Sequence, residues 1–152
     1  MRKAIIAAAV LDLVGTAASA QLPGLSKRGP GYVPQQQPMV QPIEAMRADF
    51  LAKSGSPNVY FVNDSAQLGA PARATLVAQA TWLRQHPELM VRVEGHGDPG
   101  DTRDHALAVG ARRAEEVRDY LVLLGVPAAQ LSVTSWGKEQ PGPPRTVTVL
   151  LR

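Results

Sequence analysis

A proline- and glutamine-rich segment, residues 21–42, limits which part of this 152-residue chain can form a compact domain. Its 22 residues include five prolines, five glutamines and three glycines. Such a composition buries little apolar surface and favours neither helix nor sheet, so we expect an extended, partly polyproline linker. The folded domain is then confined to the 110 residues of segment 43–152, a length that fits one domain.

The first twenty residues have the pattern of an export signal. Met1-Arg2-Lys3 is basic, an apolar run begins at Ala4, and Ala18-Ser19-Ala20 has the small residues of a signal-peptidase site. The apolar run is short and is interrupted by Asp12, whereas a membrane-spanning helix needs about 20 apolar residues. We predict a cleaved signal peptide over residues 1–20 and a periplasmic protein. The alternative is an uncleaved N-terminal anchor.

Hydrophobic patterns in segment 43–152 alternate between those of helices and those of strands. The predicted helices cover residues 43–53, 71–86 and 103–124. The predicted strands cover residues 59–62, 89–94, 131–136 and 146–151. This β-α-β-α-β-β order, preceded by a short helix, predicts an α+β sandwich in which two helices pack on one face of a mixed four-stranded sheet.

The longest predicted helix has one apolar stripe at spacings of three and four residues. The stripe consists of Leu107, Gly110, Ala114, Val117, Leu121 and Leu124. Since such a stripe faces a core, we expect these side chains to be buried against the sheet.

Composition and missing motifs exclude several classes of function. The absence of cysteine excludes disulfides, Cys-ligated zinc, iron–sulfur clusters and lipid attachment through a cysteine. The net charge of +3 is small and the basic residues are scattered, which does not favour nucleic-acid binding. No GxSxG, GxxxxGK[ST] or HExxH motif is present, so we expect neither catalytic residues nor a cofactor.

One loop and the helix after it gather potential metal ligands, namely His96, Asp98, Asp101, Asp104 and His105. Imidazole and carboxylate groups can hold a metal ion. A loop of glycine and proline does not by itself fix the required geometry, so we predict no metal site. Asp101 or Thr102 is instead expected to cap the N-terminus of the helix.

Asp98 and Arg113 form the second constellation of polar side chains. Asp98 follows the second predicted strand, and Arg113 lies at the edge of the apolar stripe, from which its guanidinium can reach the rim of the sheet. A carboxylate facing a guanidinium can bind a ligand that carries both an ammonium and a carboxylate. An ordinary surface ion pair, worth about 0–1 kcal/mol, is the other interpretation, and the spacing leaves both open.

Four motifs stand in order along the domain: Val59-Tyr60-Phe61, Val93-Glu94-Gly95-His96-Gly97-Asp98, Gly110-x-Arg112-Arg113-Ala114-x-x-Val117, and Ser135-Trp136-Gly137-Lys138-Glu139-Gln140-Pro141. Together they resemble the OmpA-like C-terminal domain family, in particular its peptidoglycan-associated lipoprotein (Pal) branch. The resemblance implies the same α+β sandwich and binding of the peptidoglycan stem peptide in the Gram-negative envelope. It implies that Asp98 and Arg113 clamp the diaminopimelate side chain. We also expect Asp64 and Thr102 to supply supporting polar contacts to the ligand, and Gly95 and Gly97 to let the loop backbone approach it closely.

The sequence also departs from the family pattern. Ala106 stands where the family has an asparagine, Asn63 replaces an aromatic residue, and the segment between Pro141 and Arg145 is shortened. Pal proteins also carry a lipidated cysteine, which is missing here, so we expect no lipid anchor. These departures favour an alternative: an interaction domain for other envelope proteins on the same scaffold, with weakened or lost peptidoglycan binding.

Overall fold

The computed structural model describes residues 42–151, so the predicted signal peptide and nearly all of the predicted linker lie outside the described residues. The elements are α1 (Ile43–Ser54), β1 (Asn58–Tyr60), α2 (Ala70–Leu83), β2 (Met90–His96), α3 (Arg103–Leu123), the short 3-10 helix η1 (Ala128–Gln130), β3 (Leu131–Gly137) and β4 (Arg145–Leu151). Every predicted helix and strand is present, with ends shifted by only a few residues. No helix within residues 42–151 combines the length and the apolar character that a membrane span requires.

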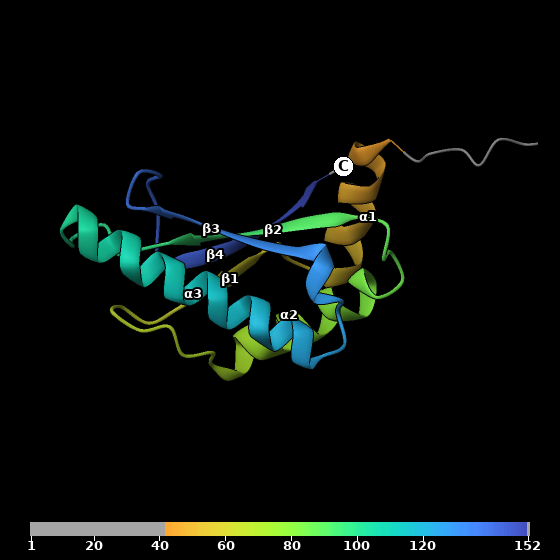
Figure 1. Cartoon of the computed structure of the whole chain (residues 1–152), viewed down its shortest axis with the longest axis horizontal. Coiled ribbons are helices and arrows are strands. Elements are labelled where there is room, and N and C mark those ends of the chain that lie inside the picture. Colours follow the sequence, from red (N-terminus) through yellow and green to blue (C-terminus); the bar gives the residue numbers. More distant parts are fainter. Residues whose placement is uncertain (1–41, 152) are drawn as a thin grey trace, which may run out of the picture. The chain divides into compact units, whose positions relative to one another are not determined.

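The four strands form one mixed sheet in the order β1-β4-β2-β3. β4 is antiparallel to both β1 and β2, whereas β2 and β3 are parallel. Parallel neighbours need a crossover connection, and α3 provides it between β2 and β3. α2 and α3 lie on one face of the sheet and α1 stands near its end (Figure 1), which confirms the predicted α+β sandwich.

The core lies between the sheet and the helices. Apolar side chains that are almost fully buried there include Val59, Leu76, Trp82, Leu83, Val91, Val93, Val117, Leu121 and Val126. α1 joins this core through Phe50, whose ring meets the Trp82 ring edge-on at 5.1 Å between centroids. The Trp82 indole donates a hydrogen bond to Asp49 Oδ2 at 2.7 Å. That bond, together with Lys53, holds the pKa of Asp49 below its usual value.

The predicted apolar stripe of α3 is confirmed at Gly110, Ala114, Val117 and Leu121 but is wrong at Leu107. Leu107 was expected in the core, but it is 49% exposed. The buried face instead passes through Ala106, Val109, Gly110, Arg113, Ala114, Val117 and Leu121. Gly110 and Ala114 face β2, and Ala106 and Arg113 flank them on the buried face, which leaves Leu107 toward solvent and places Arg113 inside the domain.

Three glycines allow β2 and α3 to approach closely. A Cβ atom on Gly95 would lie 1.8 Å from the Gly110 carbonyl oxygen, and one on Gly97 would lie 2.3 Å from the Ala106 carbonyl oxygen. A Cβ atom on Gly110 would lie 2.5 Å from Ser135 Oγ. Two of these obstructions are main-chain atoms, which cannot swing aside. The close packing of strand on helix therefore requires residues without side chains at these positions.

We predict that Gly95→Ala lowers the free energy of unfolding by about 1–3 kcal/mol, the range for an overpacked core. Gly100→Ala is the matched control, because a Cβ atom there would meet nothing within 4 Å, and we expect a change within about 0.5 kcal/mol. Urea unfolding of both variants measures the difference. Equal stability of the two variants would show that the approach of β2 to α3 is not tight.

Candidate ligand-binding site

The side chain of Arg113 lies inside the domain, and none of it is exposed to solvent. Its Nε donates to the Ser65 carbonyl at 2.7 Å, and its Nη1 donates to the His96 carbonyl at 2.9 Å. Its Nη2 donates to the Val62 carbonyl at 3.1 Å and to Asp98 Oδ1, also at 3.1 Å. One guanidinium thus holds the segment after β1, the end of β2 and the loop after β2.

Asp98 is brought into direct contact with Arg113, and its side chain is also buried. Its carboxylate additionally accepts a hydrogen bond from the main-chain N–H of Asp64. The two residues therefore meet as expected, but Arg113 points into the domain and does not reach out to the rim of the sheet. Such a buried, hydrogen-bonded pair is not the weak surface ion pair of the alternative interpretation.

Of the remaining predicted site residues, Asp64 lies beside the pair and Thr102 does not contact it. Asp64 follows β1 with a positive φ of 52°, and its carboxylate Oδ1 lies 2.9 Å from His105 Nε2. Thr102 is the N-cap of α3, since its hydroxyl accepts a hydrogen bond from the main-chain N–H of His105 at 3.3 Å. The structure thus selects Thr102 over Asp101 as the cap. Gly95 and Gly97 pack against α3.

Main-chain carbonyls supply most of the Arg113 partners, and residue types alone do not indicate them. Val62, Ser65 and His96 act through backbone oxygens, which every residue type carries. The side chain of Phe61 lies beside the guanidinium as well, with 5.4 Å between the Arg113 Cζ atom and the ring centroid. The signal that could have indicated these carbonyls is that Arg113 is buried with one acidic residue beside it. Its remaining N–H donors then need main-chain acceptors.

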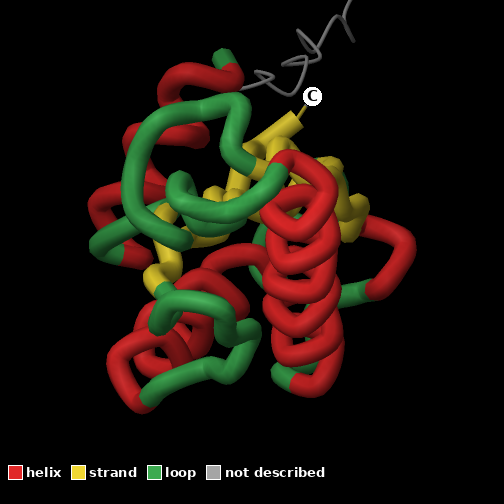
Figure 2. The backbone as a smooth tube through the Cα atoms, turned by 90° about the vertical axis from the view of Figure 1, so that its left-hand side faces the viewer, coloured by secondary structure: helices red, strands yellow, loops and turns green. Residues whose placement is uncertain are grey.

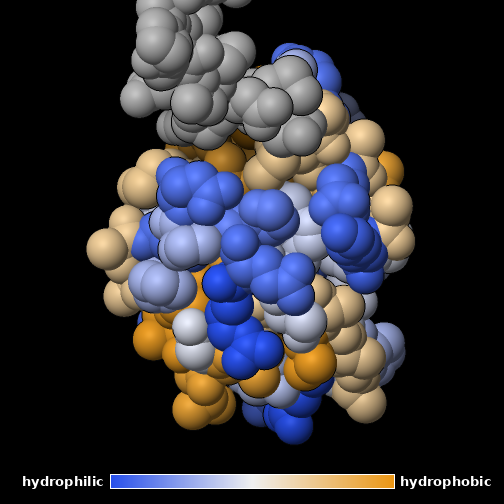
Figure 3. Space-filling model, turned by 90° about the vertical axis from the view of Figure 1, so that its right-hand side faces the viewer, coloured by the Kyte–Doolittle hydropathy of each residue, from blue (hydrophilic) through white to orange (hydrophobic). Residues whose placement is uncertain are grey.

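The loops of this site gather at one end of the sheet. The connections after β1 and after β2 and the β3–β4 connection lie at the left of Figure 1 and face the viewer in Figure 2. The opposite end, seen in Figure 3, has hydrophilic side chains across its middle and apolar ones around them. The candidate site therefore belongs to the loop end of the domain.

A shallow cleft of about 220 Å³ adjoins the loop that carries Asp98. Trp136 and Leu107, both partly exposed, line it together with Lys138. The main-chain hydrogen bond from Gly97 to Gly137, 2.7 Å long, joins the Asp98 loop to the wall of this cleft.

His96 supplies one of the carbonyls around Arg113 and also carries an imidazole ring. The ring is buried, and neither of its nitrogen atoms has a hydrogen-bond partner in the described structure. Burial lowers the pKa of His96 below 6.5, nearby Arg145 lowers it further, and Glu94 partly opposes both effects. The folded domain therefore favours the neutral imidazole at this position.

We predict that the domain loses stability as the pH falls below about 6.5, because the unfolded chain then takes up a proton at His96 that the folded domain does not. A single group contributes at most about 1.4 kcal/mol per pH unit. Urea unfolding between pH 7.5 and 5.5 should give a flatter dependence for His96→Leu than for the wild type. Identical slopes would contradict the account of a buried neutral ring.

Comparison with known proteins identifies the domain. A sequence model described as the OmpA family matches residues 60–147, which is more than half of the chain. The chain belongs to the OmpA family. Its matched segment contains both Asp98 and Arg113, so the resemblance seen in the four motifs is confirmed.

Relatives of this OmpA-family chain include the peptidoglycan-associated lipoproteins of Rhizobium meliloti (strain 1021) and Agrobacterium fabrum. They are 45% and 44% identical to it over 93 residues, which make up 61% of this chain and 52% of each relative. The chain thus spans about half the length of these relatives. The crystal structure of the peptidoglycan-associated lipoprotein from Burkholderia pseudomallei matches with a TM-score of 0.62 and 35% identity, covering 68% of this chain and all of that one.

A more distant solved structure, the C-terminal domain of Helicobacter pylori MotB, has a TM-score of 0.58 and 21% identity. It covers 62% of this chain and 84% of that chain. At this identity the likeness concerns the fold alone. The same sandwich therefore occurs in proteins that differ widely in sequence.

Proposed function

We propose that this chain is a non-catalytic peptidoglycan-binding protein of the Gram-negative cell envelope, and that it holds the diaminopimelate residue of the stem peptide. The observation that carries the proposal is the contact of Asp98 with Arg113, 3.1 Å apart, in an OmpA-family domain. The names of the relatives, peptidoglycan-associated lipoproteins, support the same ligand and indicate no enzyme.

The chemistry of diaminopimelate matches this pair of charges. Its side chain ends in an ammonium and a carboxylate on the same carbon atom, so it needs an anion and a cation side by side. Asp98 accepts hydrogen bonds from the ammonium, and Arg113 donates to the carboxylate. Charge-assisted hydrogen bonds of this kind are roughly twice as strong as neutral ones.

Ligand binding requires an exchange of partners at Arg113. The Val62 and Ser65 carbonyls occupy guanidinium donors that the ligand carboxylate needs, and the Asp64 N–H occupies part of the Asp98 carboxylate. We propose that segment 62–65 moves outward when the ligand enters. The ligand then replaces hydrogen bonds to neutral carbonyls by stronger bonds between opposite charges.

The other proposed site residues act in support. Gly95 and Gly97 let β2 approach α3 closely enough for Asp98 to meet Arg113. Thr102 fixes the first turn of α3, and Asp64 lies at the mouth of the site, where it contacts the ligand once segment 62–65 has moved. In this proposal residues 1–20 direct export to the periplasm and residues 21–42 link the domain to its surroundings.

The alternative is an envelope protein-interaction domain that no longer binds peptidoglycan. The complete burial of Arg113 favours it, as do the exposed side chains of Trp136 and Leu107 at the cleft. Both roles place the protein in the envelope and differ only in whether the Asp98–Arg113 pair opens to a ligand. A sedimentation experiment separates them.

We expect the full-length protein to sediment with insoluble peptidoglycan sacculi, and Asp98→Asn to bind at least about tenfold more weakly, because a hydrogen bond to a charged group contributes about 1.5–3 kcal/mol. The variant keeps the shape of Asp98 but removes the charge that receives the ammonium. The amounts of protein in the pellet and the supernatant measure binding.

Asp119→Asn is the matched control, because it removes the same charge from an exposed residue of α3 that lies away from the site. The binding of this variant should equal that of the wild type. Arg113→Ala is unsuitable, because it removes the hydrogen bonds to three main-chain carbonyls as well as the ion pair, whereas Asp98→Asn leaves those carbonyl partners in place. Thermal unfolding shows whether Asp98→Asn is folded. Wild-type protein that stays in the supernatant, or folded Asp98→Asn that sediments like the wild type, would refute the proposal.

A further inference from the structure

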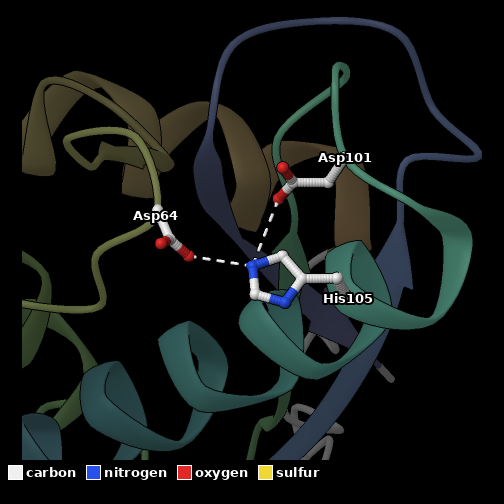
Figure 4. Close-up of side chains that lie close together, drawn as sticks. All are labelled: Asp64, Asp101 and His105. Atoms are coloured by element: carbon white, nitrogen blue, oxygen red, sulfur yellow. Dashed lines mark hydrogen bonds and ion pairs between the residues drawn. The ribbon is translucent and has the colours of Figure 1, made fainter.

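Three side chains from three places in the sequence converge beside the Arg113 cluster. They are Asp64 after β1, Asp101 after β2 and His105 in the first turn of α3 (Figure 4). His105 Nε2 lies 2.9 Å from Asp64 Oδ1 and 3.6 Å from Asp101 Oδ2. One donor atom from each residue falls within 4.8 Å of the other two.

Asp101 gives a second indication that a cation belongs here. Its Oδ2 atom is buried and accepts no hydrogen bond in the described structure. Within residues 42–151, neither Asp64 nor Asp101 forms an ion pair with a lysine or an arginine. The Lys138 ammonium lies close by but donates to the main-chain carbonyl of Asp101, not to its carboxylate. Among residues 42–151 the only basic group within 4.0 Å of this oxygen is the His105 imidazole, 3.6 Å away, so a bound cation would give the oxygen a direct partner.

We propose that Asp64, Asp101 and His105 form a binding site for a divalent transition-metal ion, with Zn²⁺ as the best match. Zn²⁺ takes imidazole nitrogen and carboxylate oxygen ligands at about 2.0–2.2 Å in a tetrahedral arrangement. Neighbouring ligand atoms in such a site are about 3.4 Å apart. Two of the three separations here are 2.9 and 3.6 Å and the third is at most 4.8 Å, so a small movement of the side chains would complete the site. Imidazole nitrogen suits Zn²⁺, whereas Mg²⁺ and Ca²⁺ prefer oxygen ligands alone.

The bound ion would have two structural consequences. Three protein ligands leave the fourth position of a tetrahedral ion open to water or to a further ligand. The ion would also pin the segment after β1 to the loop after β2, and it would therefore oppose the outward movement of segment 62–65 that exposes Asp98 and Arg113. The metal site can be tested independently of peptidoglycan binding, by a titration with the metal ion alone.

Isothermal titration of the full-length protein with ZnCl₂ tests the site. We expect one ion per chain, loss of this binding in His105→Ala, and at least tenfold weaker binding in Asp101→Asn. Asp104→Asn is the matched control, because Asp104 is also an acidic residue at the start of α3 but is not part of the cluster, and its affinity should equal that of the wild type.

The histidine ring resonances in an NMR titration give an independent readout, since the chain has three histidines. Zn²⁺ should shift the ring signals of His105 and leave those of His86 and His96 in place. Wild-type protein that does not bind Zn²⁺, His105→Ala that binds as the wild type does, or ring shifts confined to His86 or His96 would each overturn the proposal.

Discussion

A buried positive charge, the guanidinium of Arg113, fixes how the loop end of this domain is built. Taking an ion out of water costs several kcal/mol unless it is paired and hydrogen-bonded. Three main-chain carbonyls and the carboxylate of Asp98 meet that requirement here. These partners come from segment 62–65 and from residues 96–98, so the two connections must fold back onto α3 for the charge to be stable.

The close packing of β2 on α3 is the condition for this arrangement. Gly95 and Gly97 allow a contact of main chain on main chain that any side chain would block. A wider gap would carry Asp98 away from Arg113 and break the buried ion pair between them. The glycines of the loop motif therefore serve the proposed ligand site through packing, and the same packing turns Leu107 out toward the neighbouring cleft.

The sequence predicted the sandwich well, because the strand and helix periods follow directly from which faces are buried. It also predicted that Asp98 meets Arg113, since the family motifs place both at the same end of the sheet. It could not predict that Arg113 points inward, because three of its partners are main-chain carbonyls, which every residue type has. The contact of His105 with Asp64 joins residues 41 positions apart, and local spacing carries no information about such a pair.

The central claim, that Asp98 and Arg113 together recognise diaminopimelate, is tested most directly from the ligand side. Two stem peptides are titrated into the full-length protein, one with diaminopimelate and one with lysine, which keeps the ammonium but lacks the carboxylate. We predict that the lysine peptide binds at least about tenfold more weakly, since it loses the charged hydrogen bonds to Arg113. Equal affinities for the two peptides would contradict the account.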